Sequence, residues 1–121
     1  MRAADSRRRA DRLIWIGLGR YPNVKKDLPT IVVEFVSASK KDWRRDYVEK
    51  KKEYMALGIS EYWIIDRFRR TLTVVRKAGS EFLEEVILEK QTYKPSLLPG
   101  FKLPLKKLLA VADAWNRSQG E

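Results

Sequence analysis

Cysteine and histidine are both absent from this chain of 121 residues. Without cysteine there is no disulfide framework and no thiolate cage for a metal ion. Without histidine the chain lacks the side chain that most often serves as a general base and as a zinc ligand. Any catalysis would therefore use carboxylates, lysines and hydroxyl groups, or a hard cation that prefers oxygen ligands.

Long apolar segments are missing as well. No stretch approaches the roughly 20 consecutive apolar residues that span a membrane. The run LIWIGLG (residues 13–19) follows an arginine-rich start, but it is short and no small-residue cleavage pattern comes after it. It therefore does not indicate a signal peptide. We expect a cytoplasmic protein without a membrane segment.

Acidic residues are outnumbered by basic ones, 16 to 26, which gives a net charge of +10. A domain this basic attracts polyanions, and nucleic acid is the first candidate. A basic surface that serves only solubility is the other interpretation, and composition does not separate the two. Apolar residues make up 44% of the chain, enough for one small core. We expect a basic arm or loop over residues 1–27, a folded domain over residues 28–117 and a tail over residues 118–121.

Apolar periodicity and turn residues predict an α/β domain with a mixed sheet, in the order strand, helix, three strands, helix. Residues 13–19 fit a short strand or a buried helical turn equally well. Gly58 is expected just beyond the end of the first helix. The predicted strands cover residues 31–37, 60–66, 71–77 and 81–88, and the predicted helices cover residues 42–57 and 105–115.

The first of these strands contains a carboxylate, Glu34, within the apolar run IVVEFV. Strand residues alternate between faces, so Glu34 shares one face with Val32 and Val36. Both faces are mostly apolar, as in a central strand that is covered on both sides. An unpaired ionised carboxylate in such a position costs several kcal/mol or more. Glu34 therefore requires a metal ion or a basic side chain nearby.

Lys50 is the candidate partner on the predicted helix. It belongs to a helix face of otherwise apolar or aromatic residues, so its charge also points toward the core. Asp46 and Tyr54 lie one helical turn before and after it, where they can orient its ammonium group. An ordinary buried ion pair, or a lysine that extends to water, explains the same spacing. The other members of this face are Trp43, Tyr47, Tyr54 and Leu57.

These residues also form part of a longer pattern that resembles the Uma-type putative restriction endonuclease family, within the PD-(D/E)XK nuclease superfamily. The resemblance implies a restriction-endonuclease-like fold, with a mixed central sheet flanked by helices and incomplete at its N-terminus. It covers most of the chain. The positions that carry it are Pro29, Glu34, Ser37, Asp46, Lys50, Tyr54, Gly58, EYWIID (residues 61–66) and LPGF (residues 98–101).

The resemblance implies metal-dependent hydrolysis of DNA phosphodiester bonds. In that reading Glu34 and the main-chain carbonyl of Phe35 bind Mg²⁺ or Mn²⁺. The superfamily lysine normally stands two residues after the glutamate, where this chain has Val36, and Lys50 on the helix matches it instead. Lys50 would then position the attacking water. Phosphate contacts of the DNA are expected at Lys40, Lys41, Arg44 and Arg45, with further candidates in the RFRR turn, although each of these side chains also fits an ordinary solvated surface.

Two departures from the family pattern affect the expected activity. Thr30 stands where the family often has aspartate, and the superfamily's second metal-binding aspartate comes from an earlier strand. Asp5, Asp11 and Asp27 lie in polar or loop sequence and are poor substitutes for it. We therefore expect weak metal binding and an N-terminally truncated family member. The alternatives are a catalytically inactive basic nucleic-acid-binding module, or a non-functional fragment of the nuclease fold whose exposed edge promotes a homodimer or aggregation.

Overall fold

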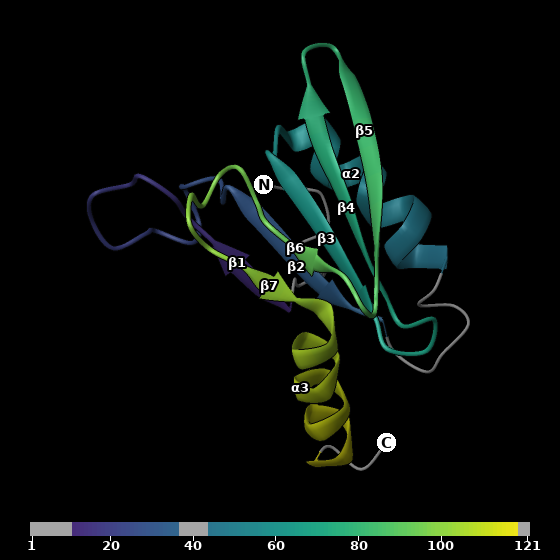
Figure 1. Ribbon diagram of the computed structural model, residues 1–121. Coiled ribbons are helices and arrows are strands. Elements are labelled where there is room, and N and C mark those ends of the chain that lie inside the picture. The colour runs from purple at the N-terminus through teal and green to yellow at the C-terminus, as the bar shows by residue number, and fades with distance from the viewer. Residues whose placement is uncertain (1–10, 37–43, 119–121) are drawn as a thin grey trace.

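A computed structural model describes residues 11–36 and 44–118. Its centre is a five-stranded sheet with the strands side by side in sequence order (Figure 1). Only β2 and β3 run parallel, and every other neighbouring pair is antiparallel. The sheet is therefore mixed, as the sequence predicted. Its strands are β1 (Arg12–Ile14), β2 (Ile31–Phe35), β3 (Glu61–Asp66), β4 (Thr71–Ala78) and β5 (Glu81–Leu88).

One face of the sheet is covered by the helical segment that connects β2 to β3 (Figure 1). The segment starts as a π-helix, η1 (Arg45–Glu49), and continues as α2 (Lys50–Leu57). Gly58 ends it with φ +92° and donates its amide to the carbonyl of Met55, as expected for a left-handed cap. The core of this layer consists of Val32, Val36, Tyr54, Met55, Ile59, Tyr62, Ile64 and Val75.

The opposite face packs against the described segment that follows β5. A small hairpin forms from β6 (Thr92–Tyr93) and β7 (Leu103–Pro104), and α3 (Leu105–Ser118) follows directly. Leu105 and Leu109 of α3 are fully buried. They belong to the larger core cluster, which also contains Ile31, Val33, Trp63, Ile65, Leu72, Val74, Ile87 and Tyr93.

The four strands and two helices predicted from the sequence are confirmed as element types within the described residues. The undecided segment at residues 13–19 starts as strand β1, because its backbone pairs with β2. This strand lies within residues 1–27, and the proposed domain boundaries stay predictions. None of the helices in the described residues is both long and apolar enough to cross a membrane.

Two features differ from the predictions. The helix predicted over residues 42–57 begins with a π-helical turn, which has a wider hydrogen-bond spacing that apolar periodicity does not reveal. The strands β6 and β7 are only two residues long each, too short for a periodic pattern. Ser37, Lys40, Lys41 and Trp43 lie outside the described residues, so the expectations for them stay predictions.

Candidate active site at the Glu34–Lys50 pair

Glu34 lies near the end of β2, and only 2% of it is exposed. It shares a sheet face with Val32 and Val36, which both pack into the core beneath α2. Because β2 and β3 are parallel, their carboxyl ends lie at the same edge of the sheet. Ligands of open α/β sheets usually bind at such an edge. The sequence pattern thus places a buried carboxylate near the carboxyl end of β2, at that end of the sheet.

Lys50 is the direct partner of Glu34. Its Nζ lies 3.0 Å from Oε1 of Glu34, and the two side chains are 7% and 2% exposed. The Oδ1 of Asp46 lies 3.4 Å from the same Nζ, one helical turn earlier. The hydroxyl of Tyr54 donates to Oε2 of Glu34 at 3.0 Å. Both oxygens of Glu34 are therefore held by side chains from the helix, and the predicted meeting of Glu34 with Lys50 occurs.

The π-helical turn sets the start of this arrangement. The backbone amide of Lys50 bonds to the carbonyl of Arg45 across that turn. The hydroxyl of Tyr62 on β3 donates to the carbonyl of Asp46 at 2.9 Å, which ties η1 to the sheet. Single π-helical turns within α-helices occur frequently at functional sites. Here the turn carries Asp46 toward the ammonium group of Lys50.

The charges at this site do not balance. Burial raises the pKa of Glu34 to about 7, although the attraction of Lys50 lowers it, and repulsion from Asp11 and Asp46 raises it further. Glu34 thus experiences the repulsion of two other carboxyl groups, whereas Lys50 forms ion pairs with Glu34 and Asp46. A raised carboxyl pKa caused by burial and like charges is typical of functional sites. A cation bound among these oxygens would relieve the repulsion.

Asp11 is the site residue that sequence reasoning set aside. Its Oδ2 accepts the backbone amide of Phe35 at 2.6 Å. In the antiparallel pairing of β1 with β2, Arg12 lies opposite Val33, so the next position would set Asp11 opposite Glu34. The available signal was an aspartate two residues before the apolar run at residues 13–19. Thr30 has a different role. Its hydroxyl oxygen accepts a hydrogen bond from the backbone amide of Ile16 at 3.0 Å, which fixes the segment between β1 and β2.

The donor atoms suit a small hard cation. Within residues 11–36 and 44–118, no three acidic side chains gather closely enough to enclose a metal ion by themselves. Two carboxylates, Asp11 and Glu34, flank the backbone of Phe35, whose carbonyl is a further oxygen donor. Mg²⁺ is usually bound by one or two carboxylates and keeps several of its waters. The residues present therefore fit that ion better than a cation that needs a full protein cage.

The predicted phosphate contacts fall into two groups. Arg44 and Arg45 are exposed at the start of η1, as a contact residue must be. In the turn that follows β3, Arg69 is exposed, whereas Arg70 binds Glu89 at 3.0 Å and Asp113 at 3.2 Å. Arg70 also has a positive φ of 58°. Its role is to hold the turn, and its charge is already paired.

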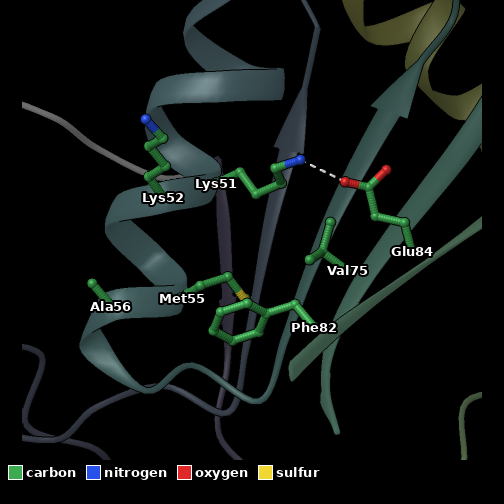
Figure 2. A pocket seen from close by; sticks show the side chains of 7 residues that line it. All are labelled: Lys51, Lys52, Met55, Ala56, Val75, Phe82 and Glu84. Carbon is green, nitrogen blue, oxygen red and sulfur yellow. Dashed lines mark hydrogen bonds and ion pairs between the residues drawn. The ribbon is translucent and has the colours of Figure 1, made fainter. Parts of the chain in front are cut away.

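A shallow pocket of about 380 Å³ lies on the same sheet face, between α2 and the β4–β5 hairpin (Figure 2). Met55, Val75 and Phe82 form its apolar surface, and an ion pair between Lys51 and Glu84 crosses one end. Neither Glu34 nor Lys50 lines this pocket. The candidate active site is therefore the Glu34–Lys50 pair near the carboxyl ends of β2 and β3, and this pocket is a separate feature.

Comparison with known proteins gives a match to a protein family and matches to solved structures. The Uma2 family, described as putative restriction endonuclease, matches residues 5–106. No protein of curated function matches the sequence. A crystal structure of a putative nuclease belonging to DUF820 from Anabaena variabilis is similar to this chain, with a TM-score of 0.47 and 22% sequence identity. The similarity covers 68% of this chain and 44% of that one, so this chain spans less than half the length of that protein.

Proposed function

Since this chain belongs to the Uma2 family of putative restriction endonucleases, we propose that its Glu34–Lys50 site hydrolyses DNA phosphodiester bonds in the manner of PD-(D/E)XK nucleases. The observation that carries the proposal is the buried ammonium–carboxylate contact at 3.0 Å, with Asp11 adjoining it at the edge of the sheet. An ion pair that serves stability alone does not require a second acidic side chain beside it. The like charges are instead useful if a cation binds there.

In this proposal Asp11, Glu34 and the carbonyl of Phe35 hold Mg²⁺ or Mn²⁺. Such a cation lowers the pKa of bound water and neutralises charge on the scissile phosphate. The protein's part is to fix the oxygens before the substrate arrives. Tyr54 does this for Glu34 through its hydrogen bond to Oε2, and the amide of Phe35 does it for Asp11. With two carboxylates, we expect metal binding to be weak.

Lys50 has the second role. Its ammonium group lies 3.0 Å from Glu34 and 3.4 Å from Asp46, so two carboxylates restrict its position. A fixed ammonium group can donate hydrogen bonds to the attacking water and to phosphoryl oxygens on which negative charge develops. Because its side chain is 7% exposed, this charge acts with little screening by water. Lys50 therefore both orients the nucleophile and stabilises the transition state.

The test is nicking of supercoiled plasmid DNA with Mg²⁺ or Mn²⁺, and with a chelator as the blank. Glu34→Gln, Asp11→Asn and Lys50→Met are each expected to lower the cleavage rate by roughly 100-fold or more, as the loss of one stabilising group in a preorganised site does. Lys51→Met and Asp27→Asn are matched controls. Lys51 binds the exposed Glu84, and Asp27 binds Arg20 in a surface loop.

The controls are expected to cleave at the wild-type rate. Cleavage that survives Glu34→Gln would exclude this site. DNA binding without metal-dependent cleavage by the wild-type protein would instead favour the inactive binding module.

A further inference from the structure

The turn between β3 and β4 carries an exposed phenylalanine among arginines, at the same end of the sheet as Glu34. It comprises Arg67, Phe68, Arg69 and Arg70 and directly follows the carboxyl end of β3. Figure 1 shows this turn at the end of the sheet where the parallel strands β2 and β3 end. The hydrogen bond from Tyr47 of η1 to Asp66 of β3 agrees with that placement.

The turn is held firmly by a buried carboxylate. Asp66 is 1% exposed, and its Oδ1 accepts the backbone amides of Phe68 and Arg69, each at 3.0 Å. Its Oδ2 accepts the hydroxyl of Tyr47 at 2.9 Å. Tyr47 is the neighbour of Asp46, whose carboxylate lies 3.4 Å from Lys50. The turn and the ammonium group are thus both anchored to the same π-helical turn.

Phe68 is exposed without a structural need. It is 48% exposed and belongs to neither core cluster of the described residues. Single exposed apolar residues are common in proteins, so the exposure of Phe68 alone does not indicate a binding site. The guanidinium group of Arg67, however, lies 4.3 Å from the centroid of this ring. A ring with a cation against it is a flat platform that suits both a nucleobase and its phosphate.

Exposed arginines lie near this ring. The side chain of Arg69 is 51% exposed, although its guanidinium group lies 3.6 Å from Oδ2 of Asp66 and 5.3 Å from the ring centroid of Tyr47. Arg44 and Arg45 are exposed at the start of η1, near the same end of the sheet. Phosphates bind to such groups in a way that does not depend on base sequence. The arginines therefore supply charge beside the platform.

We propose that this turn binds single-stranded nucleic acid, with a base stacked on Phe68 and the exposed Arg69, Arg44 and Arg45 on the flanking phosphates. This inference rests on the proposed nuclease function and adds the substrate class. An aromatic ring can stack on the face of an unpaired base, whereas bases in a duplex already stack on each other. A strand bound here would lead its next phosphates toward Glu34 and Lys50. The preferred substrate is then a nucleic acid with unpaired bases beside the scissile bond.

The test measures fluorescence anisotropy of labelled oligothymidylate and of a blunt duplex of equal length, in a chelator so that no cleavage occurs. The wild-type protein is expected to bind the single strand at least about tenfold more tightly than the duplex, because only the single strand offers unpaired bases for stacking. Phe68→Ala is expected to weaken binding of the single strand roughly 5- to 100-fold, and Phe68→Tyr to preserve it. Phe82→Ala is the matched control, because Phe82 is 49% exposed but lies on β5.

Equal affinity of Phe68→Ala and wild-type protein for the single strand would overturn the proposal. So would a preference for the duplex, or an equal loss in Phe82→Ala. Circular dichroism of each variant checks that the fold is intact. Binding that depends on Phe68 but comes without metal-dependent cleavage would overturn the nuclease function alone. Cleavage together with binding that ignores Phe68 would overturn only the assignment of the turn.

Discussion

The ammonium group of Lys50 meets the carboxylate of Glu34 at 3.0 Å inside the protein, and neither side chain is more than 7% exposed. One residue comes from a helix and the other from the strand that the helix crosses, so the contact depends on the packing of the two layers. Removing one partner of a buried pair leaves an uncompensated charge. Removing Lys50 or Glu34 is therefore expected to destabilise the protein strongly. Removing one partner of a neighbouring surface ion pair is expected to have a smaller effect.

Lys50→Met is expected to lower the free energy of unfolding by about 3 kcal/mol, because Glu34 then stays buried without its partner. Lys51→Met is the control. Lys51 pairs with Glu84 where both side chains are about one-third to one-half exposed, and such pairs contribute at most about 1 kcal/mol. Urea denaturation of the two variants and the wild-type protein measures the difference. Equal losses of unfolding free energy in both variants would show that the buried pair contributes no more to stability than the surface pair.

The stability of the protein is expected to depend on pH through Glu34. Burial raises the pKa of Glu34 from its ordinary value of 4.5 to about 7 in the folded state. The folded state therefore holds this proton more tightly than the unfolded chain does. The contribution to stability is complete below about pH 4.5 and is lost as the pH rises through about 7. The free energy of unfolding thus falls over this range, by at most about 1.4 kcal/mol per pH unit for one group.

Glu34→Gln removes this group, so its unfolding free energy is expected to change less between pH 4.5 and 7 than that of the wild type. Urea titrations across that range supply the measurement. Glu84→Gln, on the exposed strand β5, serves as the control and should retain the wild-type pH profile. A Glu34→Gln profile parallel to the wild type would contradict the assignment of the titrating group.

Much of the fold follows from local patterns. The sequence of β4 alternates, and a glycine turn separates it from the apolar-rich segment of β5, so the bounds of both strands could be predicted within one residue. The segment at residues 13–19 could not be assigned, since a short apolar run fits a strand or a helix equally well. Its backbone becomes a strand because Arg12, Leu13 and Ile14 pair with β2, and that contact is not local. Patterns within a single sequence do not predict which strands distant in the chain pair with each other, or in which register.

In the candidate site, too, some residues could be predicted from local sequence and others depend on long-range pairing. Glu34 and Lys50 could be predicted because a charge on a core-facing position is costly and demands a partner. Asp11 could not, because it is exposed and lies just outside β1, where an acidic residue needs no explanation. It reaches the site only because β1 reverses direction beside β2, which brings its carboxylate to the amide of Phe35. Long-range pairing therefore decides which acidic residues form the site.

A second buried carboxylate, Glu61, gives a prediction about the opposite face of the sheet. Its Oε1 accepts the indole N–H of Trp63 at 2.7 Å and the hydroxyl of Tyr93 at 3.0 Å. Glu61→Leu leaves both donors buried without an acceptor, which should cost about 2–4 kcal/mol of unfolding free energy. Glu61→Gln keeps an acceptor oxygen and should cost clearly less. Chemical denaturation followed by tryptophan fluorescence compares the two variants, and a glutamine variant as unstable as the leucine variant would refute this role.

The anchoring of the β3–β4 turn gives the last prediction. Asp66→Ala removes the acceptor of the Phe68 and Arg69 amides and of the Tyr47 hydroxyl, so it should cost about 2–3 kcal/mol of stability. Tyr47→Phe removes only the hydroxyl and should cost about 1 kcal/mol. Because Phe68 is positioned by Asp66, single-stranded binding should weaken in Asp66→Ala but stay near the wild-type value in Tyr47→Phe. Thermal unfolding and anisotropy below the unfolding temperature measure both effects. A folded Asp66→Ala protein that binds the single strand as the wild type does would show that the turn does not need this anchor.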